Sequence, residues 1–328
     1  MHVFRKYLLF ILFFSLLFAC RKKRCSDGVM NHGETGIDCG GKCAPCPELT
    51  NREIAVQDYN DNYLGSAISD NNLSWTGNVS SCNPGGVSAS TDQKVLQRIN
   101  YFRRLVGLND NITLDESNAH KYQKAALMLK ANNDLDHYPP TSWTCWTQDG
   151  YDGCNTSNIA LGVHSVDAVT LCIEDPGPAN NKVGHRRWIF DSEKLKFSYG
   201  TTDNSMSLGC IGAEFDGNTS FPDFIAYPPA NYIPQQLVFD RWSFGLPGSF
   251  SSGADFSSAS VVMNGPNGLV PLTIVSANTT NMADNTIVWE PQGITTNSQE
   301  DVEYTVTISN IGNTSQSSYT YAVKIINP

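Results

Sequence analysis

The spacing of apolar residues changes along this chain, and the change limits the folds that the chain can adopt. Between residues 91 and 132 apolar side chains recur at intervals of three and four, which predicts two amphipathic helices. The sequence TLDE at 113–116 indicates a capping box for the second of them. A third, short helix is predicted at 166–174, with strand-like runs after it.

The C-terminal segment, 234–328, has a different pattern. Its β-branched runs are separated by turn residues, and they are SSASVVMN, LVPLTIVS, NTIVWEP, VEYTVTISNI and SYTYAVKII. Short runs of this kind at regular spacing are typical of a small β-sandwich. The segment contains no histidine and no cysteine, so it offers no cluster for metal or nucleophilic chemistry. We therefore predict an α+β protein in which a mixed domain precedes an all-β domain.

The length of 328 residues allows more than one domain, because single cores rarely grow beyond roughly 250 residues. The predicted boundaries follow the changes in pattern. The predicted parts are a signal peptide at 1–19, a lipid-anchored cysteine-rich stalk at 20–47, a linker at 48–90, the mixed domain at 91–233 and the β-sandwich at 234–328.

The first twenty residues predict export. Arg5 and Lys6 precede an apolar run at 7–19, in the order of a signal peptide. The run LLFAC resembles a bacterial lipobox, in which Cys20 would be lipidated and become the mature N-terminus. An uncleaved membrane anchor is the alternative, because the RKKR cluster at 21–24 would favour a cytoplasmic chain. We predict a lipid-anchored protein of the bacterial cell envelope, at the outer membrane or cell surface, or outside the cell.

Ten cysteines support an oxidising compartment. Four of them lie within 25–46, a segment with too few apolar residues for a core, so disulfides are its predicted staple, with three possible pairings. A structural zinc site on these thiols and a calcium site on the nearby acidic residues are the alternatives. Further along, Cys145 and Cys154 are close enough in sequence to close a short loop. The disulfide candidates are Cys25, Cys39, Cys43, Cys46, Cys145, Cys154, Cys172 and Cys210.

The mixed domain carries a series of motifs that occur together in a known family. In chain order they are INYFRRLVGL, AALMLKANNDLDH, SNIALG, GHRRWIF and KFSYG. The series resembles the CAP superfamily of cysteine-rich secretory and pathogenesis-related proteins, also called SCP-like, and within it the bacterial branch, where GHR opens the last motif. The resemblance covers residues 91 to about 230. It implies an α/β/α sandwich with a central antiparallel sheet and a cleft on one side.

In that family two histidines and two acidic residues line the cleft, and the resemblance places the histidines at His137 and His185. Paired imidazoles with a carboxylate suit a divalent ion such as zinc or magnesium. The first acidic position is Ser157 here, since TSN stands where the family has Gly-Glu-Asn, and the second is Glu174 or Asp175. A serine hydroxyl carries no charge and binds a divalent ion poorly, so this substitution weakens a hydrolytic site.

These features favour non-enzymatic binding, with no catalytic residue assigned. The predicted partners are a small apolar molecule, a glycan or a peptide in the histidine-lined cleft, and the membrane through the lipid on Cys20. A metal-dependent hydrolase of the peptidase type with Glu174 as base, and a structural surface protein with a vestigial cleft, are the alternatives. The net charge of -10 argues against a nucleic-acid partner, because binding phosphates requires a dense basic face.

Overall fold

The computed structural model describes residues 25–31, 33–211, 220–248, 253–277 and 282–328. Contacts divide the chain into two compact units, residues 1–50 and 51–328. The predicted signal peptide and the lipidation of Cys20 lie outside the described residues. Within those residues no helix has both the length and the apolar character needed to cross a membrane.

Two disulfides hold the segment 25–46 of the first unit. Cys25 is bonded to Cys43, and Cys39 is bonded to Cys46. The prediction of disulfides in this segment is confirmed, with one of the three possible pairings. Cys25, Cys43 and Glu34 lie close enough together to suggest a metal site. Because both of these sulfurs are in a disulfide, they offer no thiolate to a metal ion.

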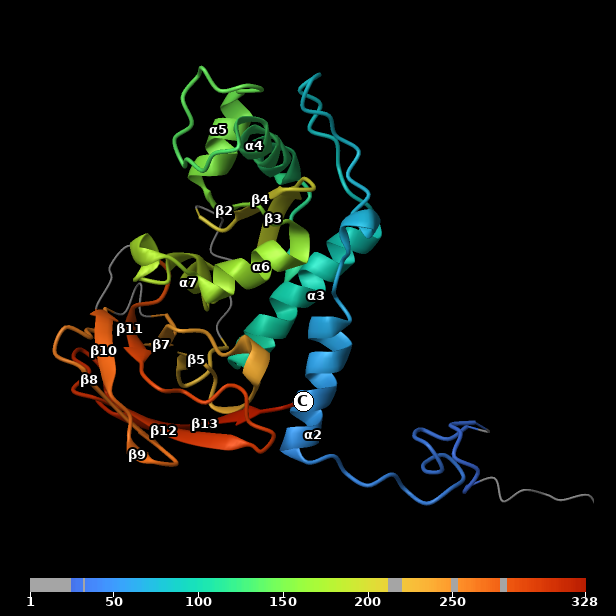
Figure 1. The fold of residues 1–328 in the computed structure, drawn as a ribbon, viewed down its shortest axis with the longest axis vertical. Coiled ribbons are helices and arrows are strands. Elements are labelled where there is room, and N and C mark those ends of the chain that lie inside the picture. The colour runs from blue at the N-terminus through green and yellow to red at the C-terminus, as the bar shows by residue number, and fades with distance from the viewer. Residues whose placement is uncertain (1–24, 32, 212–219, 249–252, 278–281) are drawn as a thin grey trace, which may run out of the picture. The chain divides into compact units, whose positions relative to one another are not determined.

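The mixed part of the second unit is a three-layer α/β/α sandwich (Figure 1). Its central sheet has the strand order β1-β3-β4-β2, in which β1 is parallel to β3 and the other pairs are antiparallel. The helices α4 and α5 cover one face, and α6 covers the other with α3 packed against it. Its elements are α3 (Ala89–Leu105), β1 (Thr113–Leu114), α4 (Ala119–Asn132), α5 (Gln148–Asn155), β2 (Ser157–Leu161), α6 (Ser165–Glu174), α7 (Gly184–Ile189), β3 (Lys196–Thr201) and β4 (Ser205–Gly209).

Local signals explain both ends of α3. The hydroxyl of Ser88 accepts a hydrogen bond from the backbone N–H of Thr91 at 3.2 Å and so caps the start of α3. Beyond the end of α3, Gly107 takes a positive φ of 79° that favours glycine. The capping box predicted at 113–116 is wrong, because Thr113–Leu114 pairs with β3 instead and α4 begins only at Ala119.

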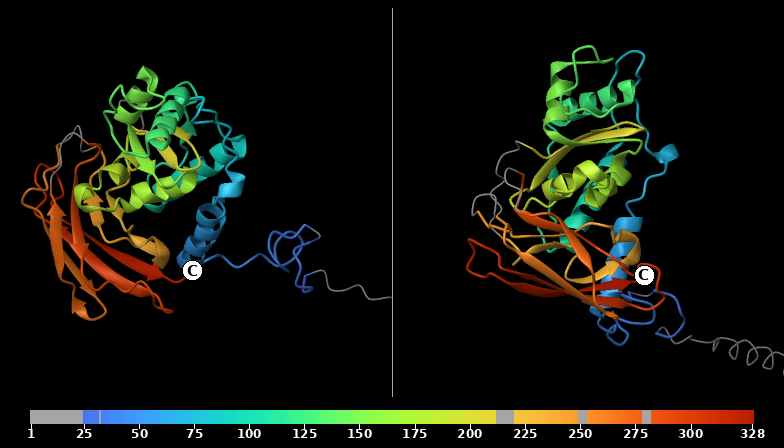
Figure 2. Two further views of the ribbon diagram at one scale, coloured as in Figure 1. Left: turned by 45° about the horizontal axis from the view of Figure 1, so that its top comes forward. Right: turned by 60° about the vertical axis from the view of Figure 1, so that its left-hand side comes forward.

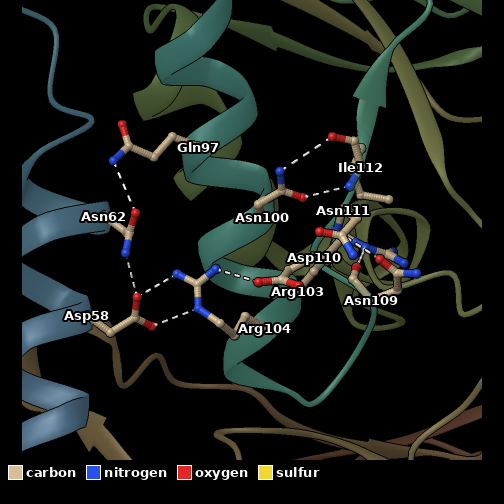
Figure 3. A network of polar contacts seen from close by, with 10 residues as sticks. All are labelled: Asp58, Asn62, Gln97, Asn100, Arg103, Arg104, Asn109, Asp110, Asn111 and Ile112. Carbon is tan, nitrogen blue, oxygen red and sulfur yellow. Dashed lines mark hydrogen bonds and ion pairs between the residues drawn. The ribbon is translucent and has the colours of Figure 1, made fainter.

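The segment predicted as a linker, 48–90, contributes to the second unit from residue 51 onward. It forms α2 (Asn51–Asp58) and a π-helical turn at Tyr59–Leu64. Polar contacts join this segment to α3 (Figure 3): Arg104 donates to Asp58 at 2.5 Å and to Asp110 at 2.8 Å. Its neighbour Arg103 is fully buried and donates to the backbone carbonyls of Asn109, Ile189, Asp191 and Lys194 at 2.8–2.9 Å. Arg103 and Arg104 therefore connect α3 to α2, to the loop at 109–110 and to the segment 189–194.

Two sheets form the predicted β-sandwich, with strand orders β10-β11-β7-β5 and β6-β13-β12-β8-β9. Large buried aromatic side chains, Trp242, Trp289 and Phe244 among them, fill the space between the sheets. Figure 2 shows this sandwich beside the helical layers of the same unit. Its strands are β5 (Ile225–Tyr227), β6 (Asn231–Pro234), β7 (Trp242–Gly245), β8 (Ser260–Gly265), β9 (Gly268–Leu269), β10 (Leu272–Ser276), β11 (Thr286–Pro291), β12 (Val302–Ser309) and β13 (Tyr319–Ile326).

The boundary predicted at 233/234 falls inside this sandwich. Strand β5 pairs with β7, and β6 pairs with β13. Strand β5 lies before residue 234, and β6 ends at it. The two strands are three and four residues long, too short to show a period of their own in the sequence. The α+β class with a sandwich is confirmed, and the sandwich starts earlier in the chain than predicted.

The cysteines of the second unit differ from the prediction. Cys145 forms its disulfide with Cys82, and Cys154, Cys172 and Cys210 are free thiols. The prediction that these three pair is wrong, because each is buried in the core, where a thiol packs as a small apolar group. Burial raises the pKa of Cys154 and of Cys210 to about 12, which keeps both protonated at neutral pH.

The number of free thiols in the chain can be measured chemically. We expect Ellman's reagent to leave Cys154, Cys172 and Cys210 unreacted in a native Cys20→Ser variant, because the thiols are protonated and shielded. The same protein in denaturant without reductant should release three equivalents per chain. Fewer than three equivalents after unfolding would show an additional disulfide and contradict the pairing described above.

Candidate ligand-binding cleft

A cavity of about 230 Å3 brings together three of the predicted site residues, His137, His185 and Ser157. Asn158, Lys182 and Trp188 also line it, and so does Met282 from the loop before β11 of the sandwich. Glu174 and Asp175 are not among its lining residues. The cleft is therefore built by both parts of the second unit.

His137 lies in the loop that follows α4. The loop leaves the helix through Asn133, whose φ of 49° is in the left-handed region that asparagine tolerates. The Nδ1 atom of His137 lies 2.7 Å from the backbone carbonyl oxygen of Cys154, near the end of α5. A carbonyl can only accept, so Nδ1 carries a proton, and in the neutral imidazole Nε2 is the nitrogen with the lone pair.

His185 stands in the first turn of α7 and is oriented by Asp175. Its Nδ1 lies 2.7 Å from one carboxylate oxygen of Asp175, and its backbone N–H donates to the other at 2.9 Å. Asp175 is buried behind the imidazole, at the left-handed residue that ends α6. Of the two candidate acids, the structure thus assigns Asp175 as the partner of His185, again leaving Nε2 as the free nitrogen. Glu174 uses its backbone carbonyl to accept from Arg186 at 3.2 Å.

The two arginines after His185 point away from the cleft and fix α7 to the sandwich. Arg186 is fully buried and donates to the carbonyls of Ile173 at 2.6 Å and Arg241 at 2.8 Å. Burial lowers the pKa of the Arg186 guanidinium to about 10. Arg187 donates to the carbonyls of Met282 and Asp284 in the loop before β11. The sequence GHRRWIF therefore combines the cleft residues Gly184, His185 and Trp188 with two arginines that serve packing.

The described contacts of the Ser157 hydroxyl pair it with another hydroxyl and not with a base that could activate it as a nucleophile. It is buried at the start of β2, and its hydroxyl lies 2.8 Å from that of Ser207 on β4. Next to it, the Asn158 side chain donates to the backbone carbonyl of His185 at 2.9 Å and so ties β2 to the first turn of α7. Asn158, Lys182 and Met282 are cleft residues that sequence reasoning did not assign. The contact between Asn158 and His185 joins strand β2 to helix α7, so no local sequence pattern predicts it.

The donors of the cleft do not fit the divalent ions predicted from the resemblance. Magnesium requires several oxygen ligands. Zinc sites in proteins have three or four protein ligands, drawn from cysteine, histidine and carboxylate side chains. In the described part of the chain, the one group of three His, Cys, Asp or Glu ligands close enough to bind a metal is that of Cys25, Glu34 and Cys43, outside the cleft. The cleft itself supplies two imidazoles and no carboxylate among its described lining residues.

A larger cavity, of about 480 Å3, lies elsewhere in the second unit. It is lined by α2, the end of α3 and the start of β6, with Asp58, Arg104 and Tyr232 among its residues. Two of its charged groups already satisfy each other, since Arg104 is bonded to Asp58. No histidine or cysteine lines it in the described chain, so the smaller cleft holds the more reactive chemistry.

Fold and cleft define this chain as an α+β protein in which an α/β/α sandwich and a β-sandwich share one histidine-lined cavity. No family model, curated protein or solved structure matches the chain. The likeness to the CAP superfamily therefore depends on the order of its motifs and on the position of the two histidines.

Proposed function

We propose that this chain is a CAP-like lipoprotein of the cell envelope whose cleft binds a small organic ligand without transforming it. The observation that supports the proposal is the paired orientation of the imidazoles. His137 and His185 both line the cavity, and each has Nδ1 occupied by an acceptor 2.7 Å away, so in the neutral rings Nε2 is the nitrogen left for a ligand. Together they form a recognition site for hydroxyl or amide donors.

The size and the walls of the cavity narrow the class of ligand. At about 230 Å3 the cavity is smaller than the roughly 300–1,000 Å3 typical of pockets for drug-sized molecules. Trp188 and Ile211 provide an apolar wall, while the imidazoles accept hydrogen bonds. One sugar ring of a glycan or one side chain of a peptide fits these properties.

The location follows from the leader and the cysteines. The lipobox-like run ending at Cys20 directs the chain to the envelope, and the disulfides described above are stable only in an oxidising compartment. A lipid on Cys20 would hold the protein at the membrane without any spanning helix.

The hydrolase alternative keeps one supporting observation. A buried carboxylate on Nδ1 of His185 would stabilise the imidazolium if Nε2 took a proton, as in general-base catalysis. Its hypothetical base, Glu174, does not line the cavity, and Ser157 is bonded to Ser207. Binding therefore explains the cleft with fewer missing parts.

Saturation-transfer NMR of the full chain with monosaccharides, dipeptides and hydroxylated aromatic fragments tests the proposal. We expect signals from at least one class that disappear in the His137→Ala, His185→Ala double variant, because both acceptors are lost. His120→Ala is the matched control, since His120 is exposed and outside the cleft. If every compound gives equal signals with the wild type and the double variant, the cleft is not a binding site and the structural alternative stands.

A further inference from the structure

We propose that the cleft is also a site for monovalent copper, bound by Nε2 of His137, Nε2 of His185 and the thioether of Met282. The proposal uses the cavity of the proposed function and adds a residue from the β-sandwich that no histidine motif contains. All three side chains line the same space of about 230 Å3.

The hydrogen bonds of both imidazoles fix Nδ1 and leave Nε2 for an ion. In metal sites the nitrogen that does not bind the ion usually donates to a carboxylate or a backbone carbonyl, which fixes the ring. His185 has the carboxylate of Asp175 in this role, and His137 has the carbonyl of Cys154, each at 2.7 Å. Both histidines line the cleft, and Nε2 is the ring nitrogen that each has left for an ion.

The position of Met282 is set by residues adjacent to His185. Its backbone carbonyl accepts a hydrogen bond from Arg187, which ties the methionine to α7. A Cβ placed on Gly184 would lie 2.7 Å from the Met282 methyl carbon and 3.9 Å from its sulfur. Glycine at 184 thus allows the thioether to rest beside the histidine. The methionine has three rotatable bonds, so its sulfur can adjust to an ion held by the imidazoles.

The donor set selects the ion. Thioether sulfur is a soft ligand that favours Cu(I), and imidazole also binds copper well. The hard ions magnesium and calcium require oxygen ligands, and no described carboxylate lines the cleft. Lys182 adds a positive charge to the rim, which repels a divalent ion more strongly than a monovalent one. The three donors therefore fit Cu(I) better than zinc or magnesium.

The test is an anaerobic titration of the full chain with Cu(I), in ascorbate, in competition with a coloured copper chelator. A Cys20→Ser background removes the thiol of the predicted lipidation site. We expect one equivalent to bind, and Met282→Leu to weaken Cu(I) binding by at least the roughly tenfold that loss of an outer-shell partner causes. Met30→Leu is the matched control, because Met30 is a thioether exposed in the first unit. X-ray absorption of the copper-loaded wild type should show two nitrogen ligands and one sulfur ligand.

Equal Cu(I) affinity of the wild type and Met282→Leu would overturn the site, and so would Cu(I) binding that survives in the His137→Ala, His185→Ala variant. Met282→Leu preserves volume, so it should leave the fold and its thermal unfolding unchanged. The NMR test of the organic ligand is run with a chelator present. A failure of copper binding and a failure of ligand binding therefore give separate results.

Discussion

Replacing Arg186 by methionine is expected to lower the free energy of unfolding by about 3 kcal/mol or more. Arg186 is fully buried and donates to the carbonyls of Ile173, Glu174 and Arg241. Methionine fills similar space but donates nothing, so these carbonyls lose their partner, and each buried unsatisfied group costs roughly 1–3 kcal/mol. Relief of the desolvated charge offsets part of this loss. Urea unfolding monitored by tryptophan fluorescence measures the change.

The matched control is Arg52→Met. The Arg52 guanidinium is bonded to Asp301, but both side chains are more than one-third exposed, and such surface pairs contribute roughly 0–1 kcal/mol. Arg186→Met should also weaken binding at His185, because Arg186 fixes the first turns of α7 against the sandwich. Equal unfolding free energies for the two variants would show that the mixed domain holds α7 without help from the sandwich.

The site residues on and around α7 could be predicted from the sequence only in part. The motif order of the sequence indicated His137 and His185, and the structure places both at one cavity. The choice between Glu174 and Asp175 required three-dimensional contacts, because adjacent residues at a helix end point in different directions. Asp175 occupies the left-handed position that ends α6, and this turn directs its carboxylate toward the backbone of His185.

Apolar periodicity predicted the long helices. It could not predict features that depend on contacts between segments far apart in the sequence. The helices α3, α4 and α6 bury one face each, so their apolar spacing is visible in the sequence. The partner of Cys145 is 63 residues earlier in the chain, and no local pattern identifies it. Met282 lies in a domain without histidine or cysteine, and its approach to His185 depends on the absence of a side chain at Gly184. Such residues become candidates only after the fold is known.

The joint between α7 and the sandwich should also depend on pH through Asp284. This side chain is buried, and one of its oxygens accepts the backbone N–H of Ser192 at 3.0 Å, while its own backbone carbonyl accepts from Arg187. Burial raises its pKa from 3.8 to about 6. A folded-state pKa above the unfolded one means that the protonated form stabilises the fold. This stabilisation is complete below about pH 4 and is lost as the pH rises through about 6.

The Asn variant of Asp284 isolates this effect, because its amide keeps an oxygen for the Ser192 N–H and does not titrate in this range. Each unit of pKa shift corresponds to about 1.4 kcal/mol, so the wild type should lose about 3 kcal/mol relative to Asp284→Asn between about pH 4 and pH 7. Urea unfolding of both proteins across that range gives the difference directly. Asp134→Asn, at an exposed position, should show no such trend. A difference that stays constant with pH would mean that Asp284 is ionised at no cost, with the neighbouring Arg187 charge compensating for its burial.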